Sequence, residues 1–165
     1  MRPRAQRPWW LRPLGAVVVA GVLVSCSGSD AKPLSRAAFT RRAEASCAEL
    51  KAAGADLAKA QDPNSTGDKV KKYVAGAVSR LRGFTDTFDQ LEPPAAFGKD
   101  ADALVDVLHR YADGLESLGE QVKGSQTFQN VLDANADQVS KLNTLAARAT
   151  VTVSRLGLNG CVLTG

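Results

Sequence analysis

The stretch "VAGAVSRLRGFTDTFDQLEPP", residues 74–94, decides the fold of this chain. Apolar or small residues recur in it at alternating steps of three and four, at Val74, Ala77, Leu81, Phe84, Phe88 and Leu91. Because an α-helix has about 3.6 residues per turn, this spacing places them on one helix face. Pro93 and Pro94 end the pattern, since proline cannot continue a helix. The stretch therefore predicts an amphipathic helix that begins near residues 66–68.

The same spacing predicts three further helices around this stretch. The first follows Ser35, a residue type that commonly caps helix N-termini, and its apolar or small face comprises Phe39, Ala43, Cys47, Leu50, Gly54 and Leu57. The third, from about Phe97 or Asp100 to Lys123, carries Leu104, Leu108, Tyr111, Leu115, Leu118 and Val122. The fourth, from about Gln126 to Gly157, carries Phe128, Leu132, Val139, Leu142, Ala146, Ala149, Val153 and Leu156.

The N-terminal residues 1–25 have the pattern of a signal peptide. An uninterrupted apolar run from Leu14 to Val24 follows a segment with no acidic residue and four arginines, Arg2, Arg4, Arg7 and Arg12. A charged segment followed by a short apolar run is typical of secretory signals. The run has eleven residues, whereas a membrane-spanning helix needs about 20. We therefore expect a cleaved targeting segment and not a permanent span.

The end of this segment, Leu23-Val24-Ser25-Cys26, resembles the bacterial lipobox. The resemblance implies cleavage between Ser25 and Cys26 and a covalent diacylglycerol on the Cys26 thiol. The alternative is an ordinary secretory signal with an incidental cysteine. Two or three acyl chains suffice for stable membrane anchoring, because each buried CH₂ contributes about 0.8 kcal/mol. Residues 26–34 would then form a lipidated tether, in which Ser27–Pro33 spans at most about 25 Å.

The charge balance of the chain changes when the signal is removed. The whole chain has a formal net charge of +4, but four of its 21 basic residues lie in residues 1–25. The remainder carries 17 basic and 17 acidic residues and is formally neutral. Nucleic-acid recognition requires a basic stripe or a known module. We therefore expect no nucleic-acid partner.

Two cysteines, Cys47 and Cys161, remain once Cys26 is lipidated. Disulfides form in the oxidising space outside the cytoplasm, so we expect this pair to be joined. The alternative is two buried free thiols. Closing a loop of this length would stabilise the fold by about 4–5 kcal/mol.

The predicted helices define an all-α protein: an antiparallel, up-down four-helix bundle with one disulfide, formed by residues 35–165. Short connections between amphipathic helices are typical of this architecture. The end of the fourth helix would lie beside the start of the first. The tail from Leu158 to Cys161 could then reach Cys47 in the third turn of the first helix.

Three short stretches of the chain match sequence patterns that recur in one group of exported proteins: "FTRRAEASCAEL" (39–50), "LEPPAAF" (91–97) and "LGLNGC" (156–161). Such sequences resemble the small, alanine-rich, exported helical lipoproteins of actinobacteria. The resemblance covers most of the chain after the signal and rests on short motifs. It implies a helical bundle and a cysteine pair, and it carries no assigned activity.

The third predicted helix carries one line of side chains that could bind a metal. Its members are spaced by three and four residues: Asp102, Asp106, His109, Asp113 and Glu116. Carboxylates and imidazole are metal ligands, which makes Asp106, His109 and Asp113 candidate ligands. This line lies off the apolar face, whereas metal sites of helical bundles project inward. We therefore expect a solvated acidic face with no metal, and a metal-binding bundle is an alternative.

The sequence favours a noncatalytic protein. No G-x-S-x-G elbow and no glycine-rich phosphate loop occurs in it. Glycines within the predicted helices, Gly54, Gly76 and Gly83, suggest either loose surface sequence or a groove for close approach of a partner.

These observations together predict an exported lipoprotein on the extracytoplasmic face of the cell membrane, held there by the lipid on Cys26. We expect it to bind an envelope protein, a lipid or a cell-wall component, with no cofactor besides the covalent diacylglycerol. An alternative is a carrier of lipid or another small ligand, with an apolar cavity between the helices.

Overall fold

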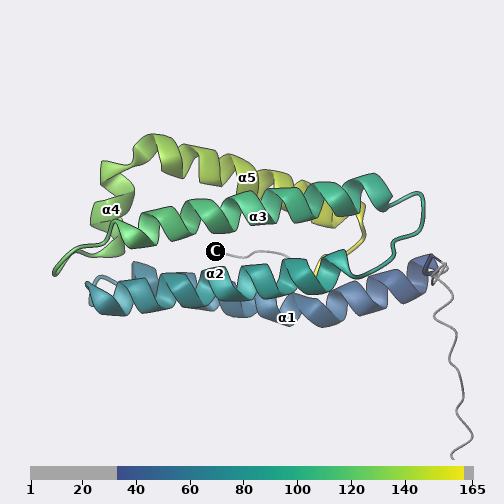
Figure 1. Cartoon of the computed structure of the whole chain (residues 1–165), viewed down its shortest axis with the longest axis horizontal. Helices are drawn as coiled ribbons and strands as arrows, with labels where there is room; N and C mark the ends of the chain where they lie inside the picture. Colours follow the sequence, from purple (N-terminus) through teal and green to yellow (C-terminus); the bar gives the residue numbers. More distant parts are fainter. Residues whose placement is uncertain (1–32, 162–165) are drawn as a thin grey trace, which may run out of the picture. The chain divides into compact units, whose positions relative to one another are not determined.

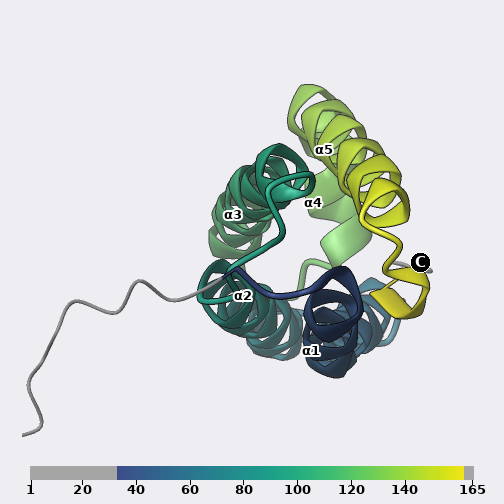
Figure 2. The same cartoon turned by 90° about the vertical axis from the view of Figure 1, so that its right-hand side faces the viewer.

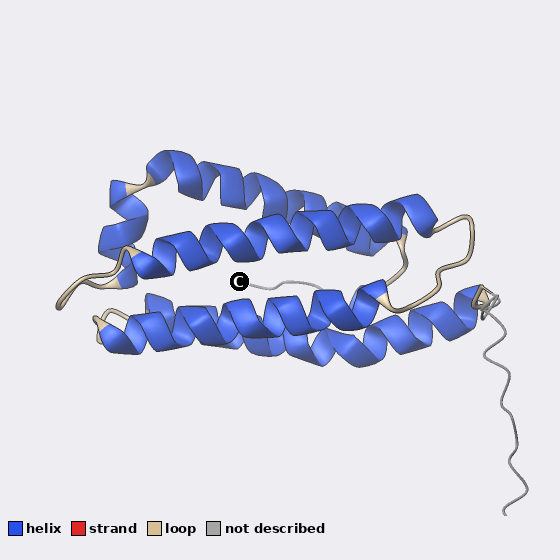
Figure 3. Ribbon diagram, viewed as in Figure 1, coloured by secondary structure: helices blue, strands red, loops and turns tan. Residues whose placement is uncertain are grey.

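The computed structural model describes residues 33–161, and this part of the chain contains helices and no strand (Figure 3). The helices are α1 (Arg36–Gln61), α2 (Asp68–Asp89), α3 (Gly98–Glu120), α4 (Phe128–Ala134), α5 (Ala136–Arg155) and the 3₁₀ helix η1 (Asn159–Cys161). The expected all-α class is confirmed.

The helix ends follow from local chemistry. Ser35 caps α1 as expected, because its side-chain oxygen accepts a hydrogen bond from the backbone N–H of Ala38 at 3.3 Å. Such a cap satisfies one of the backbone donors that have no partner inside the helix. The helix α2 ends at Asp89, shortly before Pro93 and Pro94.

The predicted apolar faces form the core. In α2, the face is buried from Val74 to Phe88, and Leu91 is half-buried beyond the helix end. In α1, the buried face shifts toward the end of the helix: Ala53 and Ala60 are buried, while Gly54 and Leu57 are half-buried. Phe39, Ala53 and Ala60 are separated by multiples of seven residues, so the buried face of α1 follows a seven-residue repeat along the helix.

The expected fourth helix is two helices, and this prediction is corrected. The break lies at Asn135, whose φ of −127° and ψ of 41° are not helical. Its side-chain amide donates to the carbonyl oxygen of Val131 at 2.8 Å, so the side chain replaces a helical backbone partner at the end of α4. Asparagine favours such local bonds over helix continuation. The seven-residue spacing from Leu132 to Val139 crosses this break, and both side chains are half-buried.

The helices pack in chain order. The long helices α1, α2, α3 and α5 lie side by side (Figures 1 and 2): α1 packs on α2, α2 on α3 and α3 on α5, while the short α4 crosses one end. The chain returns to α1 through η1, which packs on α1 (Figure 2) at the level of Glu44 and Cys47. By contrast, α5 has little direct packing on α1. The tail, and not the length of α5, therefore connects the last helix with the first.

The buried side chains of all the helices belong to one core. Leu156 and Leu158, which precede η1, are fully buried in it, and so is Phe128 of α4. Residues 33–161 thus bury their apolar faces against one another.

Candidate functional site

The predicted lipidation site lies outside the described residues. Neither Ser25 nor Cys26 falls within the range 33–161. The first described backbone contact joins the N–H of Leu34 to the carbonyl oxygen of Glu92 at 3.0 Å. Leu34, which makes this contact, lies eight residues after Cys26 in the sequence.

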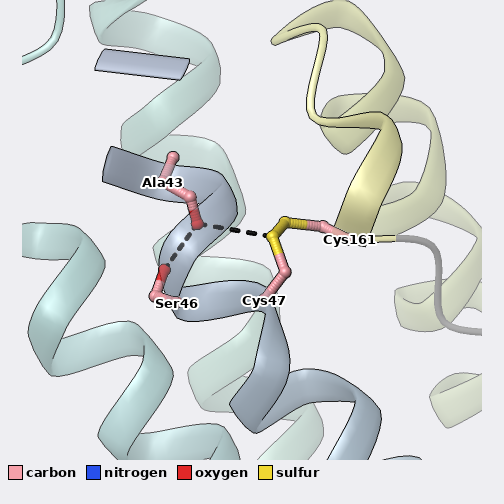
Figure 4. The surroundings of a disulfide bond; sticks show 4 residues. All are labelled: Ala43, Ser46, Cys47 and Cys161. Atoms are coloured by element: carbon pink, nitrogen blue, oxygen red, sulfur yellow. Dashed lines mark hydrogen bonds between the residues drawn. A yellow bond between two sulfur atoms is a disulfide. The ribbon is translucent and has the colours of Figure 1, made fainter. Parts of the chain in front are cut away.

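The structure brings Cys47 of α1 and Cys161 of η1 together (Figure 4). Their Cα atoms are 4.8 Å apart and their sulfur atoms lie at disulfide-bonding distance, within the range that a disulfide requires. The two residues are only 2% and 1% exposed. The Ala43 carbonyl oxygen lies 3.3 Å from Cys47 Sγ and accepts a hydrogen bond from the Ser46 hydroxyl at 2.7 Å. This pair is a buried connection between the tail and α1.

The acidic line on α3 faces outward, as expected, and part of it is bound by an arginine. Arg82 of α2 reaches across to α3 and lies 2.9 Å from Asp113 and 2.7 Å from Glu116. Asp106 lies 3.5 Å from Arg110, one helical turn away. His109 and Asp102 are exposed.

Within residues 33–161, no group of three or more histidine, cysteine, aspartate or glutamate side chains is arranged to hold a metal ion. The structure therefore does not bring the candidate ligands Asp106, His109 and Asp113 together as a site. It uses Asp113 and Glu116 in an ion-pair network that joins α2 and α3.

Arg82 also lowers the pKa of one carboxyl group in this network. Its hydrogen bond to Glu116 is the main reason why the pKa of Glu116 lies below its ordinary value. A second arginine, Arg80, lies 3.2 Å from Glu49 and 3.1 Å from Asp56, both on α1. Burial raises the pKa of Asp56, but hydrogen bonds from Lys59 and Arg80 outweigh this effect and lower it. Two arginines of α2 thus join it to the helices on either side.

Replacing Arg82 should show how strongly it lowers the pKa of Glu116. In Arg82→Gln, we expect the pKa of Glu116 to rise toward its ordinary value, because the main group that lowers it is lost. A lowered pKa in the folded state stabilises the fold above the pKa of the unfolded chain, and this contribution disappears as the pH falls through the folded value. Carboxyl titration followed by NMR measures the change. The matched variant Arg80→Gln should raise the pKa of Asp56 and leave that of Glu116 unchanged; the reverse pattern would contradict the assignment.

The glycines of α2 do not form one groove. A Cβ atom at Gly76 would lie 3.1 Å from the side-chain oxygen Oδ2 of Asp56, so this position is already covered by α1. A Cβ atom at Gly83 would meet no atom within 4 Å. The two positions share a flank of the helix but have different surroundings.

Two hollows open between neighbouring helices. The first lies between α2 and α3, has a volume of about 760 Å³, and is lined by apolar side chains and five charged ones, Lys71, Arg82, Asp86, Glu116 and Glu120. The second lies between α3 and α5 and has a volume of about 360 Å³. Its floor includes Leu142 and Leu145, and every charged side chain that lines it is basic: Arg110, Lys141 and Arg148.

The comparisons with known proteins add no relative. No protein-family model matches the chain, and no curated protein or solved structure matches it at a significant level. None of the helices in the described range combines the length and the apolar character needed to cross a membrane.

The sequence did not predict the ion pairs that Arg80 and Arg82 make with neighbouring helices. It also did not predict the basic lining of the hollow between α3 and α5. Arg80 and Arg82 stand beside the apolar face of α2, and their spacing alone does not show which neighbour each one reaches. The basic residues of α5 had a readable signal, because Lys141, Arg148 and Arg155 are each seven residues apart.

Proposed function

We propose that this chain is a lipid-anchored, noncatalytic binding module on the extracytoplasmic face of the cell membrane. One observation carries the proposal: Leu34, which makes the first described backbone contact of the helical domain, lies eight residues after the cysteine of the lipobox-like Leu23–Cys26. The connecting residues Ser27–Pro33 extend at most about 25 Å. The domain would therefore work beside the membrane that holds the lipid.

We also propose that the domain is an antiparallel four-helix bundle of α1, α2, α3 and α5, locked by a Cys47–Cys161 disulfide. The packing order of the helices and the short connections between α1, α2 and α3 support this arrangement. The distance between the two cysteines supports the bond.

Surface binding is favoured over internal carriage. The two hollows open to the surface between neighbouring helices, and the apolar side chains beneath them belong to the core. A lipid carrier requires an apolar cavity that encloses most of its ligand. The metal-binding alternative would need Asp113, which Arg82 already holds at 2.9 Å. Zinc binding by the wild-type protein that His109→Ala abolishes would favour this alternative.

The anchoring proposal has a direct test in cells that process bacterial lipoproteins. Cys26→Ala should abolish the incorporation of radiolabelled fatty acid, because no other thiol follows a signal-type apolar run. The protein should then remain as an unprocessed precursor or appear in the medium. Cys47→Ala is the matched control and should still be labelled. Equal labelling of wild type and Cys26→Ala would refute lipidation at this residue.

The partner is best sought by crosslinking in intact cells. Recovery of one stoichiometric membrane protein would favour an adaptor, whereas recovery of a lipid or a glycan would favour binding of that component.

A further inference from the structure

The flank of α5 that borders the hollow between α3 and α5 is basic along its length. Three residues spaced by seven, Lys141, Arg148 and Arg155, lie on one side of the helix, because seven residues are almost two turns. No acidic residue occurs from Gln138 to Cys161. The three cations span roughly 21 Å along the helix.

These cations are accessible. Lys141 and Arg148 are exposed, and within residues 33–161 no carboxylate forms an ion pair with either of them. Arg155 lies 3.8 Å from Asp100 of α3, and its side chain is 65% exposed. Lys141 and Arg148 line the hollow between α3 and α5, and Arg110 lines it from α3. Arg110 pairs with Asp106 of the same helix at 3.5 Å.

An apolar side chain stands among them. Val151 is 51% exposed and is the only large apolar residue exposed to this extent in the described part of the chain. It lies three residues after Arg148 and four residues before Arg155, and hence on a neighbouring strip of the helix surface. We call the surface formed by Lys141, Arg148, Val151 and Arg155 the basic α5 face.

This surface differs from the rest of the domain. The chain after residue 25 carries equal numbers of basic and acidic residues, so the charge of the basic α5 face is a local excess. In the groove between α2 and α3, by contrast, acidic side chains stand beside the basic ones, and Arg82 is bound to Asp113 and Glu116.

We propose that the basic α5 face docks on the anionic phospholipid headgroups of the membrane to which Cys26 tethers the protein. The inference rests on the proposed function, because the tether keeps the domain within about 25 Å of that membrane. A row of cations beside an exposed apolar side chain suits a membrane surface, where phosphates lie next to hydrocarbon. An acidic protein is the competing occupant of this surface, and binding to soluble polyglutamate distinguishes it from the membrane.

Vesicle binding of a chain that begins at Ser27 tests this docking separately from lipidation. This chain lacks the signal and Cys26 but keeps the whole core formed within residues 33–161. We expect it to bind vesicles of equal parts phosphatidylglycerol and phosphatidylcholine, to bind phosphatidylcholine vesicles weakly, and to lose binding as salt rises. The triple variant Lys141→Gln, Arg148→Gln, Arg155→Gln should lower vesicle affinity on the order of a hundredfold.

The matched control removes three exposed cations from α1 and α2: Arg41→Gln, Lys51→Gln and Lys72→Gln. It changes the net charge equally and should retain most of the affinity. Val151→Asp should weaken binding in the wild-type background, and circular dichroism confirms that each variant is folded. An equal loss in both triple variants would overturn the proposal. Binding to soluble polyglutamate without binding to anionic vesicles would also overturn the proposal. Failure of lipidation would instead appear as missing fatty-acid label in cells, with vesicle binding intact.

Discussion

Breaking the bond between Cys47 and Cys161 is expected to lower the free energy of unfolding by about 4–5 kcal/mol. The two residues are 114 positions apart, so their bond would remove much of the freedom of the unfolded chain. Domains of this size have total stabilities of only about 5–15 kcal/mol. The packing supports a large effect as well, because η1 makes the main connection between α5 and α1.

Denaturant unfolding followed by circular dichroism, with and without reductant, measures this loss. Helicity before the transition should be unchanged, because α1, α2 and α3 pack on one another independently of the tail. The control is the double variant Cys47→Ala, Cys161→Ala, whose free energy of unfolding should not change when reductant is added. Intact mass under nonreducing conditions decides whether the bond exists: two free thiols in freshly exported protein would refute it.

Phe39→Ala should destabilise the domain by about 3–5 kcal/mol, the usual cost of a large cavity in a core. Phe39 of α1 is fully buried. Its ring meets that of Phe88 of α2 edge-on, with centroids 5.7 Å apart, and lies 6.0 Å from that of Phe97 before α3. The Phe39 side chain therefore connects α1 with α2 and with the segment that precedes α3.

The same unfolding experiment measures this variant. Val151→Ala is a suitable control, since Val151 is 51% exposed and surface substitutions usually change stability by no more than about 0.5 kcal/mol. A loss below about 1 kcal/mol for Phe39→Ala would contradict the role of this aromatic contact in the core.

The helices and most of their buried faces could be predicted from residue spacing. The face from Val74 to Phe88 is buried as predicted, because helical periodicity is a local property of the chain. The start of α1 was equally local, since Ser35 caps it through a bond to a residue three positions away. The outward direction of the acidic line on α3 followed from its position beside the apolar face.

The break at Asn135 is also local, because its side chain bonds to Val131 four residues before it, but the apolar spacing crosses the break and therefore did not predict it. Other features depended on how the helices meet. Spacing along α2 could not show that Arg82 binds Asp113 and Glu116 of α3, whereas Arg80 binds Glu49 and Asp56 of α1. Likewise, the charges that line each groove come from two helices at once. A sequence pattern specifies which side of a helix is apolar, but the rotation and contact of neighbouring helices determine which polar side chains come together.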